Sequence, residues 1–275
     1  MSDDLEHLDD YPTQGVVSAE AALVTAWSSL ENFHQDLVLV GGLAIYLHTR
    51  EKVDPLYRPT ATLDVDFGIT LAADAGLAAP AAFALGQAGF KEDDKGRIYR
   101  KTEHGMLYLD FLTEHPPSSS GTRNVSDLVT SVFPGINRAL ESSVLRTVRG
   151  IDHLGDERSF GIPVCNYGPL LVLKLNAFAT RTGPKRAKDA YDILSLVRSN
   201  VDGPEAAVTS FGKEKRSDNQ GLRRALETLE AHFTSADKLG PSLAASFYLG
   251  SQADKESSLR LREDLVTVGH ALLGA

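Results

Sequence analysis

One stretch of the sequence constrains the fold more than any other: DLVLVGGLAIYLHTREKVDPLYRPTATLDVDF, which begins at Asp36. A short apolar run typical of a strand, residues 37–40, ends on Gly41-Gly42, and a helix-compatible segment, residues 43–48, follows. Glycine lacks a Cβ, so the backbone at this turn can approach a ligand closely. If a helix begins directly after the glycines, its free N–H groups and its dipole favour an anion such as phosphate. The stretch therefore predicts a strand–turn–helix unit that can bind phosphate.

The same stretch ends in a second strand-like run, residues 63–67, which carries Asp64 and Asp66. Successive side chains on a strand point to opposite faces, so both carboxylates are expected on one face. Two neighbouring carboxylates repel each other, and a bound divalent cation removes that penalty. Carboxylate oxygens suit Mg²⁺ or Mn²⁺. The spacing therefore predicts a metal site on this strand.

A third carboxylate, Asp110, lies inside a clear apolar strand, residues 105–113. A charge in such a strand is costly unless it is paired or bound to a metal. One interpretation is an ion pair with a nearby arginine or lysine; with Asp64 and Asp66 upstream, we favour metal binding. Each feature alone has a plainer explanation, because Gly-Gly after a strand is commonly just a turn and Asp-x-Asp is commonly a solvated strand face. Their order along the chain favours a combined phosphate and metal site.

The composition excludes several classes of protein. The chain has 275 residues and a single cysteine, Cys165, which excludes an internal disulfide and a cysteine-based zinc site. Its net charge of −9 argues against general coating of nucleic acid but leaves room for a local basic groove. The acidic N-terminus has no signal-peptide pattern, and the longest apolar run, residues 37–47, is too short to span a bilayer. We expect a cytoplasmic protein with no membrane segment.

The pattern of elements changes after Tyr167. Up to residue 166 we expect an α/β (α+β) domain with a mixed sheet, in which residues 1–15 form a flexible leader. Its other expected elements are a helix at 18–33, a helix at 73–89, a strand pair at 90–102, a short helix at 126–133 and strands at 144–150 and 160–164. Residues 167–275 are expected to form an α-helical domain, with helices at 170–181, 185–199, 204–211, 222–232 and 257–273 and a flexible loop at 212–220.

A second group of charged residues lies in the first two of these helices, in the run LLVLKLNAFATRTGPKRAKDAYDIL. Lys174 is set among apolar residues and needs an anionic partner, and it lies on the same helical stripe as Arg181. Lys188 and Asp192 have the spacing of ordinary ion pairs on helix surfaces. For Lys174 and Lys188 we favour contact with phosphate, with Asp189 and Asp192 positioning the lysines.

The connection at residues 49–61 is long, and long loops in compact domains are often functional. It carries Arg50 and Arg58 beside the predicted phosphate site. Phosphate contact and a solvated surface position are equally consistent with the sequence for both arginines.

These features together resemble the DNA polymerase β-type nucleotidyltransferase superfamily: a strand, Gly41-Gly42 and a helix, then Thr62-x-Asp64-x-Asp66, then Asp110 on a later strand. The later motifs resemble the branch that includes the AbiEii abortive-infection toxins and related toxin–antitoxin enzymes; they read Lys174-Leu175-x-Ala177-Phe178-x-x-Arg181 and Lys188-Asp189-x-x-Asp192. The resemblance covers residues 35–196 in patches.

The resemblance implies a nucleotidyltransferase-like fold and an enzyme that transfers an NMP from an NTP to a hydroxyl group and releases pyrophosphate. Two Mg²⁺ ions would clamp the attacking and leaving oxygens of an in-line displacement. The residues implied in catalysis and metal binding are Asp64, Asp66 and Asp110, the last as base or second-metal ligand. The residues implied in nucleotide binding are Gly41, Gly42, Lys174, Arg181, Lys188 and Asp189. The acceptor would be an RNA 3′ end such as that of tRNA, a protein or a small molecule, and a toxin role with a cognate antitoxin is implied by the resemblance alone.

Two departures from the family pattern lie before the carboxylates. The gap from Gly42 to Asp64 is longer than in compact members of the superfamily, although this branch includes long ones. Many relatives place an arginine two residues before the threonine that precedes the carboxylates; here that position is Thr60, and Arg58 is the nearest candidate.

Two other functions fit part of the pattern. A non-catalytic nucleotide- or partner-binding module, such as an antitoxin-like protein, would have little need of three carboxylates. A glycosyltransferase could use Asp64 and Asp66 to hold a metal–nucleotide-sugar complex, but Gly41-Gly42 and Asp110 fit that activity less well. We therefore expect a nucleotidyltransferase.

Overall fold

A computed structural model describes residues 5–52, 54, 56–59, 62–71, 80–103, 105–250 and 254–275. The contacts between residues divide the chain into two compact units. The sheet unit contains Pro12–Ala44 and Thr62–Asn166, and the helical unit contains the described parts of Ser2–Tyr11, Ile45–Ala61 and Tyr167–Ala275. Two segments that precede residue 166 are therefore grouped with the helices. The predicted division into domains at residue 166 stays a prediction.

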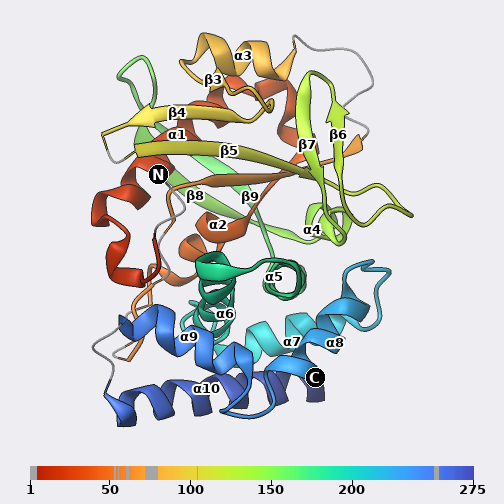
Figure 1. The fold of residues 1–275 in the computed structure, drawn as a ribbon. Helices are drawn as coiled ribbons and strands as arrows, with labels where there is room; N and C mark the ends of the chain where they lie inside the picture. The colour runs from red at the N-terminus through yellow and green to blue at the C-terminus, as the bar shows by residue number, and fades with distance from the viewer. Residues whose placement is uncertain are drawn as a thin grey trace. The chain divides into compact units, whose positions relative to one another are not determined.

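The sheet unit is built on one mixed sheet with the strand order β3-β4-β5-β2-β1-β9-β8, to which β6 and β7 are joined through β5 (Figure 1). The pairs β1–β9, β2–β5 and β5–β7 are parallel, and the other pairs are antiparallel. The mixed sheet predicted from the sequence is thus confirmed. The strands are β1 (Leu37–Val40), β2 (Val65–Ile69), β3 (Lys91–Glu92), β4 (Ile98–Thr102), β5 (Gly105–Thr113), β6 (Thr122–Val125), β7 (Leu128–Val132), β8 (Ser143–Ile151) and β9 (Glu157–Cys165).

The core of the sheet unit forms around its central strands. All four residues of β1 are buried, as expected for an apolar run in the middle of a sheet. Phe67 of β2 contacts Trp27 of the first helix, α1 (Thr13–Ser29), and Phe111 of β5, with ring centroids 6.3 and 5.7 Å apart. The first helix therefore packs against the sheet, as its apolar stripe predicts. The remaining helical elements of the sheet unit are η2 (Glu31–Asp36), α3 (Ala81–Gln87), α4 (Ile136–Glu141) and the first turn of α2 (Gly41–Thr49), whose residues from Ile45 on are grouped with the helical unit.

The short helix predicted at 126–133 is wrong. These residues form the turn and second strand of the β6–β7 hairpin, and the turn is made by Ser126, whose φ is +55°. Burial along β7 alternates from Leu128 to Val132, which is the period of a strand and not of a helix. Its β-branched residues Val129 and Thr130 also favour a strand.

Several boundaries differ from the sequence prediction. The first helix begins at Thr13 and not at residue 18, and α4 was not predicted. The helix predicted at 73–89 is observed as α3, with Pro80 as its N-cap, while residues 73–79 lie outside the described residues. The second strand begins at Val65, so Asp64 directly precedes it.

The helical unit contains the helices predicted after Tyr167. They are α5 (Tyr167–Thr180), α6 (Gly183–Arg198), α7 (Pro204–Glu214), α8 (Leu222–His232) and α10 (Lys255–Gly274), together with α9 (Leu239–Leu249), which was not predicted. The first residues of the flexible loop predicted at 212–220 belong to α7, which ends at Glu214. Glu214 is buried and accepts a hydrogen bond from Asn219 Nδ2 at 2.9 Å, which links the loop to the end of the helix. Within the described chain, no helix combines the length and apolarity that crossing a membrane requires.

The N-terminal segment of the helical unit is not a loose leader over its described residues. Leu8 is buried, His7 Nδ1 lies 3.1 Å from the carbonyl oxygen of Ser246, and η1 (Leu8–Asp10) adds a short helical turn. Arg58 forms an ion pair with Asp9 at 2.7 Å, with both side chains more than half exposed. Of the two interpretations of Arg58, the structure therefore shows the surface one.

Candidate active site

The turn after β1 is positioned against a carboxylate of the next strand. Gly41 follows Val40 directly, opens α2 and has a φ of +70°, a conformation that favours glycine. Val40 pairs with Asp66 in the antiparallel β1–β2 register. A Cβ built on Gly41 would lie 1.9 Å from Asp66 Oδ2. The strand–turn–helix unit predicted from the sequence is present, and its first glycine is required by contact with Asp66.

Two of the three predicted carboxylates lie on neighbouring parallel strands, and the third directly precedes one of these strands. Asp66 of β2 and Asp110 of β5 are direct partners in the strand register, so their side chains lie on one face of the sheet, with the strands roughly 4.8 Å apart. Asp64 is tied to β5 as well, because its Oδ1 accepts a hydrogen bond from the backbone N–H of Tyr108 at 3.2 Å. The fold thus brings together carboxylates that are far apart in the sequence.

A basic side chain that the sequence analysis missed holds Asp110. The Arg97 guanidinium donates two hydrogen bonds to Asp110, from Nε to Oδ1 at 2.9 Å and from Nη2 to Oδ2 at 2.7 Å, and lies 3.9 Å from the centre of the Tyr108 ring. Burial lowers the pKa of Arg97, but the carboxylates of Asp110 and Asp64 more than offset this, and its pKa is raised above the ordinary value. The ion pair that the sequence left as the alternative for Asp110 is therefore observed.

The donor atoms around Asp66 suit a divalent cation. Three carboxylates and one guanidinium carry a net charge of −2, and carboxylate oxygens are ligands that Mg²⁺ and Mn²⁺ accept. Each carboxylate oxygen of Asp110 accepts one hydrogen bond from Arg97 and retains a second acceptor position. Among the residues that the structure describes, no three Asp, Glu, His or Cys side chains converge as a ready ligand set. The chemistry of the site therefore fits a metal ion, and ligation would require the side chains to reorient.

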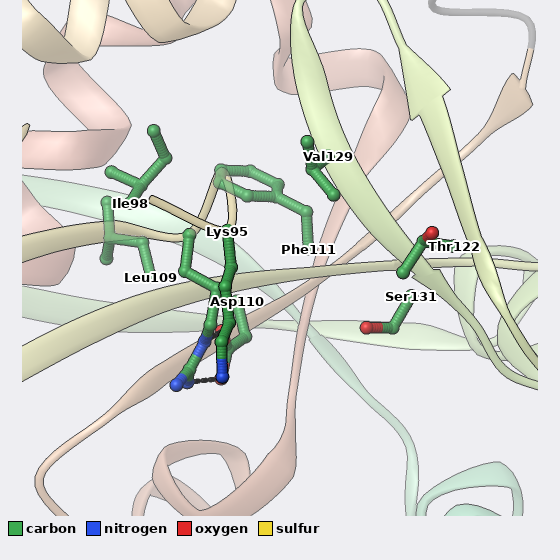
Figure 2. Close-up of a pocket in the computed structure, with 9 residues that line it drawn as sticks. Lys95, Ile98, Leu109, Asp110, Phe111, Thr122, Val129 and Ser131 are labelled. Atoms are coloured by element: carbon green, nitrogen blue, oxygen red, sulfur yellow. Dashed lines mark hydrogen bonds and ion pairs between the residues drawn. The ribbon is translucent and has the colours of Figure 1, made fainter. Parts of the chain in front are cut away.

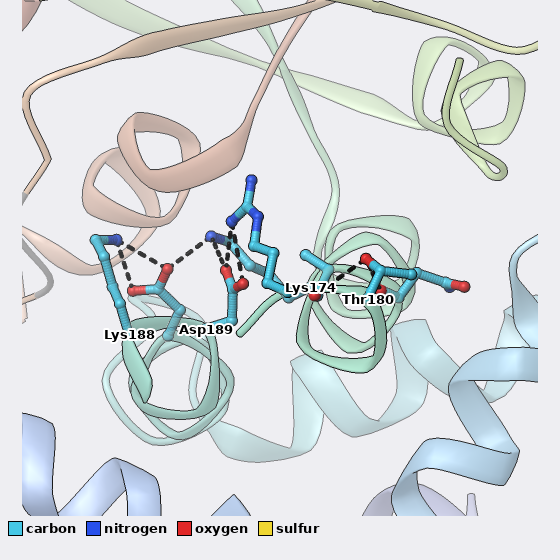
Figure 3. Close-up of polar contacts among 8 residues, drawn as sticks. Lys174, Thr180, Lys188 and Asp189 are labelled. Atoms are coloured by element: carbon cyan, nitrogen blue, oxygen red, sulfur yellow. Dashed lines mark hydrogen bonds and ion pairs between the residues drawn. The ribbon is translucent and has the colours of Figure 1, made fainter. Parts of the chain in front are cut away.

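A separate charged cluster lies in the helical unit, on α5 and α6 (Figure 3). Lys174 Nζ donates to Asp189 at 3.0 Å and to Asp192 at 2.7 Å, Lys188 Nζ donates to Asp192 at 2.9 Å, and Arg181 donates to Asp189 at 3.0 Å. Both aspartates are at most 1% exposed. The prediction that these aspartates position the lysines agrees with this geometry.

The two lysines of this cluster differ electrostatically. Burial lowers the pKa of Lys174, but Asp192 and Asp189 together raise it above the ordinary lysine value. For Lys188, burial outweighs the attraction of Asp192, and its pKa is lowered. The cluster combines three cations with two anions, so one positive charge is in excess. Its predicted role in nucleotide binding stays a prediction.

Gly41→Ala is expected to reduce the free energy of unfolding by about 1–3 kcal/mol, because the added methyl group is strained at positive φ and meets the Asp66 carboxylate. Urea denaturation followed by circular dichroism measures the loss. Gly155→Ala is the matched control: its φ is +87°, yet a Cβ there meets nothing within 4 Å. Equal losses in the two variants would show that the contact with Asp66 contributes nothing.

Comparison with known proteins identifies the family. The family model described as nucleotidyl transferase AbiEii toxin, type IV toxin–antitoxin system, matches residues 22–246. Searches of curated proteins and of solved structures found no significant match. The family match spans most of both units, including the Gly41 turn, the three carboxylates and the charged cluster of α5 and α6. The chain therefore belongs to the AbiEii family of nucleotidyl transferase toxins of type IV toxin–antitoxin systems.

Proposed function

We propose that the chain transfers an NMP from an NTP to a hydroxyl group of an RNA 3′ end, such as that of tRNA, or of a protein. A bond forms between the acceptor oxygen and the α-phosphorus, the bond from the α-phosphorus to the pyrophosphate oxygen breaks, and pyrophosphate leaves. The observation that carries the proposal is the pairing of Asp66 with Asp110 on neighbouring strands, with Gly41 against Asp66. Membership of a nucleotidyl transferase family supports it.

Each part of the sheet unit has a role in this reaction. Gly41 and Gly42 open a helix, whose free N–H groups favour the triphosphate. Asp64 and Asp66, with Asp110, would hold Mg²⁺ or Mn²⁺, and the bound ions would offset the charge that develops on the phosphate oxygens. Asp110 would accept the proton of the acceptor hydroxyl through an oxygen position that Arg97 leaves open.

The helical unit contributes two further elements to the proposal. Lys174, Lys188, Arg181 and Asp189 form the nucleotide-binding group predicted from the sequence, and their excess positive charge is suited to phosphate. Membership of a type IV toxin–antitoxin family supports regulation by a cognate antitoxin protein.

A label-transfer experiment tests the proposal. The purified protein is incubated with Mg²⁺, each α-labelled NTP in turn and total cellular RNA, and products are separated by size. We expect label on an RNA band with the wild-type protein and none with Asp64→Ala/Asp66→Ala. The labelled NTP then names the base.

The same experiment separates the two acceptor classes and the other functions. Label on the protein itself would indicate protein nucleotidylation. NTP binding without any transfer would favour a non-catalytic binding module or a small-molecule acceptor. Turnover of a nucleotide sugar in a donor screen, without transfer from NTPs, would identify a glycosyltransferase.

A further inference from the structure

A gap in the sheet lies directly beside Asp110. Along one edge of β5, pairing with β4 ends at Leu109, opposite Ile98, and pairing with β7 begins at Leu112, opposite Ser131. At Asp110 and Phe111, β5 therefore changes from one partner strand to the other along this edge. A cavity of about 210 Å³ occupies this place, entirely within the sheet unit (Figure 2).

The polar side of the cavity faces the same way as the carboxylates. Ser131 pairs with Leu112, two residues after Asp110, and Thr122 pairs with Ser131. Residues two apart on a strand share a face, so both hydroxyl groups lie on the face of the sheet that carries Asp110. Lys95 lines the cavity as well.

The other side of the cavity is apolar. Ile98 and Phe111 line it, and Figure 2 shows both across the hollow from Ser131 and Thr122. An apolar and aromatic floor with hydroxyl groups and a cation at its edge suits a nucleobase joined to a phosphate. The volume is below the roughly 300–1,000 Å³ of sites that enclose drug-sized ligands, so the cavity suits one nucleobase and not a whole nucleoside triphosphate.

The strand order decides which substrate the cavity serves. From the cavity the sheet runs through β5 with Asp110, then β2 with Asp66, then β1 and its turn at Gly41. The cavity and the turn therefore lie on opposite sides of the carboxylates, and Asp110 lines the cavity whereas Asp64 and Asp66 do not. In-line displacement requires the acceptor and the leaving pyrophosphate on opposite sides of the phosphorus.

Resting on the proposed function, we infer that the cavity binds the 3′-terminal nucleotide of an RNA acceptor strand and directs its hydroxyl group toward Asp110. The terminal base lies on the apolar floor, Ser131 and Thr122 donate and accept hydrogen bonds at its edge, and Lys95 contacts the adjacent phosphate. The gap between β4 and β7 thus receives the acceptor, and the Gly41 turn receives the triphosphate.

Ser131→Tyr fills the cavity from an exposed position, and KM for a short synthetic RNA is expected to rise roughly 10-fold or more, with KM for the NTP unchanged. Ser159→Tyr is the matched control, because Ser159 is an exposed serine on a strand of the same unit and does not line the cavity.

Lys95→Gln is expected to reduce the slope of log KM for RNA against log salt concentration by about 0.7, as for the loss of one phosphate contact on a single strand. Lys101→Gln, which changes an exposed lysine of β4, should leave the slope unchanged.

Photocrosslinking tests the same inference without turnover. A short RNA with a 3′-terminal 4-thiouridine is irradiated with the wild-type protein, and the crosslinked residues are mapped by mass spectrometry. Crosslinks within residues 95–98, 109–111 or 122–131 are expected. Transfer to RNA with crosslinks elsewhere, or with Ser131→Tyr behaving like Ser159→Tyr, would overturn the inference and leave the proposed function intact. Crosslinks in the cavity without any transfer would overturn the proposed function and the acceptor role that rests on it, and would leave only RNA binding in the cavity. The absence of both crosslinks and transfer would overturn RNA binding there as well.

Discussion

Asp66→Asn is expected to abolish nucleotide transfer, with a fall in rate of about 1,000-fold or more. Asp66 contacts both other parts of the candidate site. It pairs with Asp110 in the strand register, and its Oδ2 lies against Gly41. Metal stabilisation of charge in the transition state is worth several kcal/mol, and about 1.4 kcal/mol corresponds to tenfold in rate. Label transfer to RNA at saturating NTP measures the change.

Asn has almost the same size as Asp and removes one negative charge beside Asp110, so the variant should remain folded by circular dichroism. Asp94→Asn is the control, since Asp94 is an exposed carboxylate of the β3–β4 turn in the same unit. In cells, overexpression of the wild-type chain should slow growth, and Asp66→Asn should relieve this. If Asp66→Asn keeps more than a tenth of the wild-type rate, Asp66 has no part in the chemical step. If the variant transfers no nucleotide but still arrests growth, toxicity does not depend on nucleotide transfer.

Lys174→Met should lower the free energy of unfolding by about 3 kcal/mol, the largest stability effect that we expect in the helical unit. Lys174 is 8% exposed and is shared by Asp189 and Asp192, which are buried. Removing one partner of a buried ion pair leaves uncompensated charge, at a cost of about 3–5 kcal/mol. The expected loss of stability lies at the lower end of this range because Arg181 still pairs with Asp189 and Lys188 still pairs with Asp192. Chemical denaturation followed by circular dichroism measures it.

Two further variants identify the cause. Lys185→Met changes an exposed lysine of α6 and should stay within about 0.5 kcal/mol of the wild type. Lys174→Met/Asp189→Leu removes one buried charge of each sign and should recover at least half of the loss, because a buried pair can be replaced by apolar residues at little cost. If the double variant were less stable than Lys174→Met, lost packing and not uncompensated charge would explain the effect.

The pKa of Lys174 gives this prediction a pH dependence. Because its pKa is raised in the folded protein, the stabilisation from its charge is complete below the ordinary lysine value of 10.5 and is lost as the pH rises above it. The difference in stability between the wild type and Lys174→Met should therefore narrow only in strongly alkaline solution.

Much of the candidate site was predictable because its signals are local. The apolar run of β1, the glycines after it and the spacing of Asp64 and Asp66 lie within one stretch, and each follows from the conformation of a few residues. The motif of Lys174 and Lys188, with the family resemblance, narrowed the assignment to the branch that the family match confirms.

The errors have the opposite origin. Residues 126–133, the turn and second strand of the β6–β7 hairpin, were predicted as a short helix, although alternation along Leu128–Val132 is visible once the partner strand is known. Arg97 was missed as the partner of Asp110 because the two residues meet only across the β4–β5 hairpin, in which Ile98 pairs with Leu109. Local periodicity contains no information about register between strands.

The sequence by itself determined the family, the strand–turn–helix unit and the carboxylates available for chemistry, because motif spacing and glycine conformation are properties of the local chain. Only the tertiary structure decided that Asp66 and Asp110 are neighbours, that Arg97 holds Asp110 and that a cavity opens where β5 changes partner. These features depend on strand register and packing, which are set by contacts between residues far apart in the chain.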